Sequence, residues 1–464
     1  MTSHYLEIYR SQKAFYDSGA TRSASFRKEQ LEKLWQLIKK NEKQFEEALY
    51  EDLHKHPQEV FITEFGPAYE EIKVQIKNFR KWMKPRRVPT PIFLQPSVSR
   101  IYPEPVGNTL IITPWNYPLI LTMRPLAGAI AAGNTVLIKQ SEYSANTSTL
   151  IETLINNEFP SQYIHAIPGI GSEVLPPILE QCHFGRVFFT GSTIVGSKVM
   201  EMAAKQLSPV SLELGGKSPC IIDNTANLTL AAKRIVWGKL LNCGQSCVAP
   251  DYLLVHEDVK EKLLQLIISE IEKNYGKDVQ HNPDYGRIIH EGRYRKLLSY
   301  LSEGKIVYGG NTNDEDRFIA PTIMEDLAPG ANLMKEEIFG PILPVFTYKN
   351  NGEVLSKIAE NPYPLSVYVF SNDRKMQDLI LQQVPFGGGC INETIYHLAN
   401  HHMPFSGVGA SGMGGHLGKH SFDLFTHYKG VVKKANLPEP FFRFPPFTDQ
   451  KAKLWRRIVD RKWF

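Results

Sequence analysis

The chain has 464 residues, of which 42% are hydrophobic and 22% charged. This composition excludes disordered and fibrous classes, and the length exceeds what one hydrophobic core usually organises, so we expect two or three globular parts. The formal net charge of +5 is too small at this length to indicate a nucleic-acid partner.

Cysteine usage and the N-terminal sequence indicate the compartment. The few cysteines, odd in number, argue against a disulfide framework and for a reducing environment; they are Cys182, Cys220, Cys243, Cys247 and Cys390. The start, MTSHYLEIYRSQ, has no apolar stretch of signal-peptide length, and no apolar run approaches the ~20 residues that a membrane-spanning helix needs. We therefore expect a cytoplasmic protein.

Two amphipathic helices are predicted near the N-terminus. Apolar residues three, four or seven positions apart over residues 26–50 predict one helix. A second helical pattern runs from about Glu59 to Met83 and stops at Pro85. Six prolines in residues 85–105 forbid a helix and disfavour a central strand, so we expect an extended excursion or linker there.

From Asn108 onward, apolar strands alternate with helix-length stretches. The candidate strands are TLIIT, TVLIK, YIHAI and RVFFT, and the helices are expected to begin near Pro118, Ser144, Ser172 and Thr193. A second round follows Glu213, with candidate strands SPCIID, DYLLVH and LSVYVF. This alternation predicts parallel strands covered by helices on both faces, in two α/β units with a boundary near residue 210.

Open parallel sheets bind ligands at the carboxyl ends of their strands, so residues that follow strands are candidates for a site. After TLIIT, the sequence PWNYP places Asn116 at a strand exit, before a proline suited to start a helix. Lys139 and Glu142 follow TVLIK, roughly where a nucleotide ribose lies in such folds. A solvated charge pair at a strand end is the alternative interpretation.

Three further segments combine glycine turns with polar groups. GSTIVG, residues 191–196, could receive a phosphate at a helix start, or could be only a tight connection. ELGGKSP places Glu213 beside a Gly-Gly turn, where its carboxylate could face a cleft or lie exposed at a domain junction. EEIFGP offers Glu337 and Phe339 to a sugar hydroxyl and a flat ring, although a helix end explains the segment equally well.

The segment LLNCGQSCVAP carries Cys243 and Cys247. They form a single C-x-x-x-C pair, and no second pair or nearby histidine completes a zinc site, so we expect no metal. An unperturbed thiol is only a few per cent thiolate at neutral pH, so catalysis needs a base or a local positive charge. A buried structural cysteine, a pair that oxidises to a disulfide and a nucleophile are the remaining alternatives.

Six motifs occur together in a specific order: TPWNYP, FTGSTIVG, LELGGKSP, GQSC, EEIFGP and PFSGVGASGMGG. In this order the chain resembles the NAD(P)-dependent aldehyde dehydrogenase superfamily over roughly residues 1–430. The early position of Asn116, the GKHSFDLFTH stretch and the RFPPF tail are similar to the class 3 branch, which acts on fatty and aromatic aldehydes.

The resemblance implies a role for each matching position. Cys247 would be the nucleophile, Glu213 the general base and Asn116 an oxyanion donor. Lys139 and Glu142 would meet the adenosine ribose, with Glu142 favouring NAD while NADP stays an alternative. The residues implied at the cofactor are Trp115, Lys139, Glu142, Gly191, Ser192, Thr193, Ile194, Val195, Gly196, Leu214, Gly215, Glu337 and Phe339.

The resemblance also implies an architecture of two open parallel-sheet α/β domains, one Rossmann-like for the cofactor and one catalytic, with a small bridging flap. Residues 1–82 and 105–210 would bind the dinucleotide, and residues 211–393 would form the catalytic domain. The bridging segments would be 83–104 and 394–440. A homodimer is implied, because the family oligomerises through such a flap.

Residues 441–464 predict an amphipathic tail. Its apolar face would carry Leu454, Trp455, Ile458, Val459 and Trp463, and six lysines and arginines lie mostly around it. Such a helix could lie on an anionic membrane surface, peripheral to the cytoplasm. Packing against the parent domain or a second subunit is the alternative.

The expected function is oxidation of medium-chain aliphatic or aromatic aldehydes to carboxylic acids. It would pass through a thiohemiacetal and a thioester of Cys247, with hydride transfer to NAD(P)+. Two rival functions use the same residues differently. One is a thiol hydrolase or acyl transferase without redox chemistry, and the other is a non-catalytic binding protein on the same scaffold.

Overall fold

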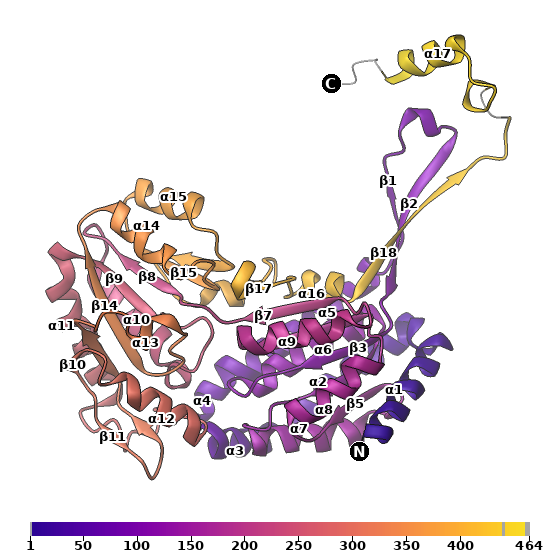
Figure 1. Ribbon diagram of the computed structural model, residues 1–464. Coiled ribbons are helices and arrows are strands. Elements are labelled where there is room, and N and C mark those ends of the chain that lie inside the picture. Colours follow the sequence, from indigo (N-terminus) through magenta and orange to yellow (C-terminus); the bar gives the residue numbers. More distant parts are fainter. Residues whose placement is uncertain (1, 439–440, 460–464) are drawn as a thin grey trace.

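The computed structural model describes residues 2–438 and 441–459. In this part of the chain, a six-stranded and a seven-stranded sheet, each flanked by helices, form the body, and a three-stranded sheet projects from it (Figure 1). A further pair of short strands, β11 (Thr312–Asn313) and β12 (Phe318–Ile319), pairs separately. This is the mixed α/β architecture with parallel sheets that the sequence predicts.

The N-terminal helices correct one prediction. They are α1 (Thr2–Asp17), α2 (Ala24–Lys40), α3 (Glu42–Leu53), α4 (Pro57–Val60), the π-helical turn η2 (Phe61–Phe65) and α5 (Gly66–Trp82). The single helix expected over residues 26–50 is wrong, because the chain breaks at Asn41. Its side-chain Nδ2 donates to the carbonyl oxygen of Leu37 at 2.7 Å. A short polar side chain bonded to the preceding turn competes with continuation of the helix.

The six-stranded sheet has the order β17-β7-β6-β3-β4-β5, and all its pairs are parallel except the one between β17 and β7. Its strands are β3 (Asn108–Ile112), β4 (Thr135–Lys139), β5 (Ile164–Ile167), β6 (Arg186–Gly191), β7 (Val210–Leu214) and β17 (Gly412–Met413). The helices between them are α6 (Pro118–Ala132), α7 (Ala145–Glu158), α8 (Gly171–Gln181) and α9 (Thr193–Ala204). The four strands and helix starts predicted for this region are confirmed within a few residues.

The seven-stranded sheet has the order β10-β13-β14-β9-β8-β15-β16, with β10 alone antiparallel to its neighbour. Its strands are β8 (Pro219–Ile222), β9 (Tyr252–His256), β10 (Lys305–Tyr308), β13 (Thr322–Glu325), β14 (Ile342–Tyr348), β15 (Ser366–Phe370) and β16 (Gly388–Ile391). Its helices are α10 (Leu228–Leu240), α11 (Lys260–Tyr275), α12 (Glu291–Tyr300), α13 (Asn332–Lys335), α14 (Asn351–Ala359) and α15 (Arg374–Gln383). The chain passes from one sheet to the other between Leu214 and Pro219.

The proline-rich segment forms two strands of the projecting sheet, which consists of β1 (Arg86–Val88), β2 (Ser97–Pro105) and β18 (Thr426–Lys434) in the order β1-β2-β18. The expectation that prolines keep this segment out of a central strand is therefore wrong. β1 pairs only with residues 99–101 of β2. Pro103 and Pro105 lie beyond that stretch, where β2 has β18 as its neighbour and needs no donor on its other side.

The tail begins after β18 and contains α17 (Asp449–Val459). In Figure 1 this helix lies beyond the end of the three-stranded sheet, apart from both α/β units. Trp455 donates from Nε1 to the carbonyl oxygen of Phe442 at 3.2 Å, and the two rings meet edge to face at 5.4 Å. These contacts hold α17 against the start of the tail. Trp463 lies outside the described residues. No described helix is long and apolar enough to cross a membrane.

Candidate active site

The loop between α10 and β9 positions Cys247. The turn η4 (Leu241–Gly244) follows α10 directly, and Cys243 within it has a positive φ of 56°. Gly244 also has a positive φ, and a Cβ at this position would lie 2.3 Å from the carbonyl oxygen of Gly340. The turn thus packs directly on the EEIFGP segment. Cys247 is half-buried, and both cysteines are free thiols, so they do not form a disulfide.

The surroundings of Cys247 favour its protonated thiol. Burial raises the pKa of this thiol well above its ordinary value, and the negative charges of Glu213 and Glu337 raise it further. Burial also raises the pKa of Cys243, to about 12. A thiolate at Cys247 therefore needs a proton acceptor rather than a stabilising cation, and the two carboxylates that interact with it are the candidates.

Asn116 is bonded to the same loop. Its Nδ2 donates to the carbonyl oxygen of Gln245 at 3.1 Å, and its side chain is almost fully buried. The backbone carbonyl oxygen of Asn116 accepts from Asn242 Nδ2 at 2.8 Å and from Lys55 Nζ at 2.9 Å. Side-chain hydrogen bonds therefore hold the exit of β3 against the cysteine loop. They fix the Asn116 amide at Gln245, which lies two positions before Cys247 in the sequence.

Lys55 anchors this arrangement from the N-terminal helices, and sequence reasoning missed it. Its ammonium pairs with Glu64 at 2.8 Å, and both side chains are fully buried. Glu64 also accepts from the backbone N–H of Ile120, at the start of α6. The ring of Tyr117 lies 4.0 Å from the Lys55 ammonium. No local pattern identifies Lys55, because its hydrogen-bond partners Glu64 and Asn116 lie 9 and 61 positions away.

Glu213 is the penultimate residue of β7, near the junction between the two sheets. Its Oε2 lies 2.9 Å from Nε2 of His416, with Thr190 Oγ1 at 3.4 Å on the neighbouring strand. His416 was also missed, although it directly follows the PFSGVGASGMGG motif. The carboxylate is buried and interacts electrostatically with Cys247, so the structure brings the predicted base and nucleophile into one site.

Glu337 and Phe339 close the site from the other sheet. A Cβ on Gly215 would lie 2.0 Å from Glu337 Oε2, so only glycine permits this approach. Burial, followed by the charge of Asp251, raises the pKa of Glu337 to about 8. The Phe339 ring meets the Trp115 ring edge to face at 5.3 Å, which joins the β3 exit to the EEIFGP segment.

The GSTIVG turn lies between β6 and α9, next to the end of β7. Ser192 caps α9 by accepting from the Val195 N–H at 3.4 Å. Ile194 and Val195 are exposed, and Gly196 packs on Leu214, where an added Cβ would lie 2.5 Å from Cδ2. Gly191 pairs in register with Leu214. Thr193 bonds to the carbonyl oxygen of Ala410 at 3.1 Å. The exposed first turn of this helix suits a phosphate.

Lys139 ends β4 and Glu142 follows this strand, at the same edge of the sheet. Their charged groups lie 3.5 Å apart, with the Lys139 side chain 3% exposed and that of Glu142 35% exposed. Burial lowers the pKa of Lys139, and the charge of Glu142 partly opposes this shift. The pair is therefore not the fully solvated one that the simpler interpretation requires.

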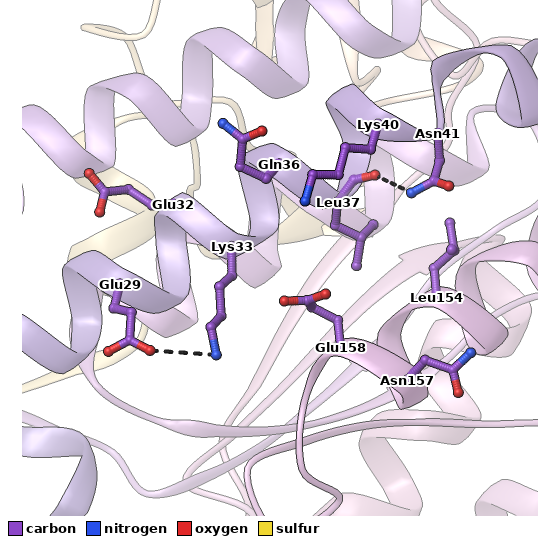
Figure 2. A pocket seen from close by; sticks show the side chains of 10 residues that line it. All are labelled: Glu29, Glu32, Lys33, Gln36, Leu37, Lys40, Asn41, Leu154, Asn157 and Glu158. Carbon is purple, nitrogen blue, oxygen red and sulfur yellow. Dashed lines mark hydrogen bonds and ion pairs between the residues drawn. The ribbon is translucent and has the colours of Figure 1, made fainter.

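Within the described residues, no group of three or more His, Cys, Asp or Glu side chains could hold a metal ion. Figure 2 shows a surface groove between α2 and α7, where polar side chains such as Glu32, Lys33 and Glu158 line the walls. None of the predicted site residues lines it.

The model of the aldehyde dehydrogenase family matches residues 6–431, which include every predicted catalytic and cofactor residue. The chain belongs to the aldehyde dehydrogenase family. It is therefore an aldehyde-oxidising enzyme, and the resemblance noted from its motifs is confirmed. NAD(P) is the cofactor of this family.

Two relatives locate the aldehyde dehydrogenase within its family. The chain is 46% identical over 437 residues to the 4,4'-diaponeurosporen-aldehyde dehydrogenase of Staphylococcus aureus, covering 94% of this chain and 95% of the relative. It is 40% identical over 461 residues to aldehyde dehydrogenase family 3 member A2 of Pongo abelii, covering 99% and 94%. These matches confirm the class 3-like branch.

A solved structure supports the same assignment for the fold of this aldehyde dehydrogenase. The substrate-bound state of Staphylococcus aureus AldH matches with a TM-score of 0.95 and 44% sequence identity. The match covers 98% of this chain and 99% of the other.

Proposed function

We propose that this aldehyde dehydrogenase oxidises medium-chain aliphatic or aromatic aldehydes with NAD, using Cys247 as the nucleophile. One observation carries the proposal. The half-buried Cys247 lies in a loop that is hydrogen-bonded to the Asn116 amide, and its thiol interacts with the buried Glu213 carboxylate. A nucleophile, an oxyanion donor and a base therefore meet at one place.

The first step is addition of the Cys247 sulfur to the aldehyde carbon. The thiol must lose its proton as the sulfur attacks, and Glu213 is the carboxylate whose charge affects the thiol most, so Glu213 accepts that proton and passes it to solvent before the second half of the reaction. The carbonyl oxygen becomes an alkoxide, which the Asn116 amide and the Cys247 backbone N–H stabilise. Loss of one such donor typically costs about 3 to 4 kcal/mol at the barrier.

The second half of the reaction releases the acid. When bound, NAD supplies the hydride acceptor, and a thioester at Cys247 is left behind. Glu213 then takes a proton from a water molecule that attacks the thioester carbon, the C–S bond breaks, and the thiol re-forms. A thiol hydrolase or acyl transferase would use only this second half.

The cofactor residues support NAD over NADP. Lys139 and Glu142 occupy the exit of β4, where the adenosine ribose lies in sheets of this kind. The Glu142 carboxylate accepts ribose hydroxyls and repels an added phosphate. Trp115, Glu337 and Phe339 hold the nicotinamide half, while the exposed turn of residues 191–196 receives the diphosphate.

An apolar aldehyde suits the surroundings of the thiol. Cys247 packs against an apolar cluster that includes Val248, Leu365, Phe405 and Leu417. Burial of each CH₂ group of a substrate contributes about 0.8 kcal/mol, so such a lining favours aliphatic or aromatic chains over small polar aldehydes. The S. aureus relative is named for 4,4'-diaponeurosporen-aldehyde.

The overall organisation is also part of the proposal. Residues 1–82 and 105–210 form the dinucleotide-binding domain and residues 211–393 the catalytic domain, with 83–104 and 394–440 as bridging segments. Within the second bridging segment, β17 joins the six-stranded sheet and β18 the projecting one. The three-stranded sheet projects from the body, which suits contact with a second subunit in a homodimer (Figure 1).

The tail of residues 441–464 binds an anionic membrane surface, which places a cytoplasmic enzyme at the periphery of a membrane. Phe441 and Phe447 are 69% and 78% exposed. The helix α17 follows them in the sequence and carries exposed Arg456 and Arg457. Exposed rings together with cations match an interfacial anchor. Co-sedimentation with phosphatidylserine vesicles should fall when the tail is deleted, and unchanged binding would refute this assignment.

The activity is tested by mixing protein, aldehydes of graded chain length and either coenzyme. The absorbance of reduced nicotinamide should rise, more steeply for medium-chain and aromatic aldehydes than for acetaldehyde, and more with NAD than with NADP. Ester hydrolysis without any such rise would favour the thiol hydrolase. Coenzyme binding without either activity would favour a binding protein.

A further inference from the structure

His416 forms a buried pair with Glu213, and the reaction outlined above gives His416 no role. Oε2 of Glu213 and Nε2 of His416 are 2.9 Å apart, and their side chains are only 4% and 2% exposed. The backbone fixes both residues. β17 pairs with β7 so that Gly412 lies opposite Glu213, and Phe405 brackets His416 with two backbone hydrogen bonds of 2.9 and 3.0 Å.

The surroundings determine which ring nitrogen carries the proton. Nδ1 of His416 is buried and has no hydrogen-bond partner among the described residues. The rings of Phe188 and Phe405 pack on the imidazole at 5.3 and 5.5 Å. A doubly protonated ring would bury an unpaired N–H against these aromatic rings, which is unfavourable. The tautomer that donates from Nε2 to the Glu213 carboxylate leaves no buried N–H without an acceptor, so we assign it here.

The charge of Glu213 is balanced from another element. Arg124, on α6, is buried and interacts electrostatically with both Glu213 and Glu71 of α5. Glu213 thus has a cation within range and does not need a positive charge on His416. His416 instead fixes the orientation of the Glu213 carboxylate, because a hydrogen bond to a carboxylate is strong only in a narrow range of geometry.

The two oxygens of Glu213 differ in their contacts. Oε2 accepts from His416 and, more weakly, from Thr190 Oγ1 at 3.4 Å. Oε1 is buried and has no hydrogen-bond partner among the described residues. An unpaired carboxylate oxygen in a buried site is costly unless a water molecule or a reacting group uses it.

We propose that His416 is a positioning residue, which holds Oε2 of Glu213 so that Oε1 takes the proton of the water that hydrolyses the thioester. This inference rests on the proposed role of Glu213 as the base. In the step itself, the water oxygen bonds to the thioester carbon, its proton goes to Oε1, and the C–S bond breaks. The sulfur leaves with the bonding electrons and regains a proton, giving the thiol and the carboxylic acid.

The experiment follows single turnovers of the full-length enzyme with NAD and an aldehyde. His416→Leu should slow thioester breakdown roughly tenfold to hundredfold, as expected for loss of a hydrogen bond to a charged group. Hydride transfer should be nearly unchanged, so a burst of reduced nicotinamide should precede the slow steady state. His420→Leu, four residues away on a half-exposed side chain, is the matched control and should show no burst.

Two amides of different reach separate positioning from packing. The His416→Gln amide nitrogen can reach the place of Nε2 and should restore breakdown to within a few-fold of wild type. The shorter His416→Asn amide cannot reach it and should stay slow. This comparison also holds if the leucine variant does not fold.

The outcomes are distinguishable from failure of the proposed function. Glu213→Gln should accumulate acyl-enzyme, and if it does not, the role of Glu213 itself is refuted. If Glu213→Gln accumulates acyl-enzyme while folded His416 variants all break it down at the wild-type rate, only the positioning role of His416 is refuted. Equal slowing in the Gln and Asn variants would also refute it.

Discussion

The Lys55 ammonium donates a hydrogen bond to the backbone carbonyl of Asn116 at 2.9 Å, across 61 positions of sequence. The same ammonium pairs with Glu64 in a site with no solvent exposure. Because Asn116 in turn bonds the loop of Cys247, an ion pair of the N-terminal helices supports the geometry around the thiol.

Replacing Lys55 separates stability from activity. Lys55→Met leaves the Glu64 carboxylate buried and unpaired, so the free energy of unfolding should fall by about 3 to 5 kcal/mol. The double variant Lys55→Met/Glu64→Gln removes that charge and should recover most of the stability, while activity stays low because the Asn116 carbonyl still lacks its donor. Denaturant unfolding and steady-state assays measure both. Lys39→Met, at an exposed pair, is the control, and recovery of both properties in the double variant would contradict this account.

The reactivity of Cys247 should depend on Glu337 only at high pH. Since the pKa of Glu337 is about 8, this carboxyl is mostly neutral below pH 8 and resembles the amide of Glu337→Gln. Above pH 8 its negative charge opposes thiolate formation, so removing that charge lowers the pKa of Cys247. Alkylation rates with iodoacetamide should coincide below pH 8 and be faster for Glu337→Gln above it. Glu336, which is exposed and adjacent, provides the control, and Glu336→Gln should have the wild-type alkylation rate at every pH. A wild-type rate at every pH for Glu337→Gln would contradict an effect of the Glu337 charge.

Gly215→Ala should weaken coenzyme binding. The new Cβ would lie 2.0 Å from Glu337 Oε2, so the carboxylate must move away from the position proposed for the nicotinamide ribose. We expect the NAD dissociation constant to rise roughly tenfold, equivalent to about 1.4 kcal/mol. Fluorescence titration measures this constant. Gly430→Ala, where an added Cβ meets nothing within 4 Å, should leave it unchanged. Wild-type affinity in folded Gly215→Ala would exclude Glu337 from the coenzyme site.

Glu142→Gln should improve the use of NADP. The Glu142 side chain is 35% exposed, so repulsion of a ribose phosphate at about 4 Å is worth roughly 1 kcal/mol, or about fivefold in KM for NADP. Steady-state kinetics with both coenzymes measure the ratio. Glu173→Gln tests for a general charge effect at the same edge. If Glu142→Gln leaves the NADP to NAD ratio unchanged, the carboxylate does not select the coenzyme.

The sequence predicts β3, β4, β5, β6, β8, β9 and β15 of the two large sheets because buried runs such as TLIIT and TVLIK are short, apolar and bounded by turn residues. It does not predict the other strands of these sheets. It does not predict the break at Asn41, where one side-chain bond overrides a continuous apolar pattern. Nor does it reveal β2 as a middle strand, since the prolines count against this until the shortness of β1 is known.

The residues of the site also divide into those that the sequence predicts and those that it does not. Residues that follow strands, such as Asn116 and Glu213, could be found because parallel strands place their exits at one edge. Lys55 and His416 could not, because each reaches the site through folding contacts across 61 and 203 positions. The raised pKa of Cys247 also depends on carboxylates brought in from other strands and loops.

The central claim is that Cys247 carries the substrate during oxidation. Glu213→Gln enzyme should be mixed with NAD and an aldehyde, quenched in acid and digested, and its peptides weighed by mass spectrometry. The account predicts an added acyl mass on the peptide that contains Cys247, which hydroxylamine removes and which Cys247→Ala abolishes together with turnover. Continued aldehyde oxidation by Cys247→Ala, or an acyl group on another residue, would contradict it.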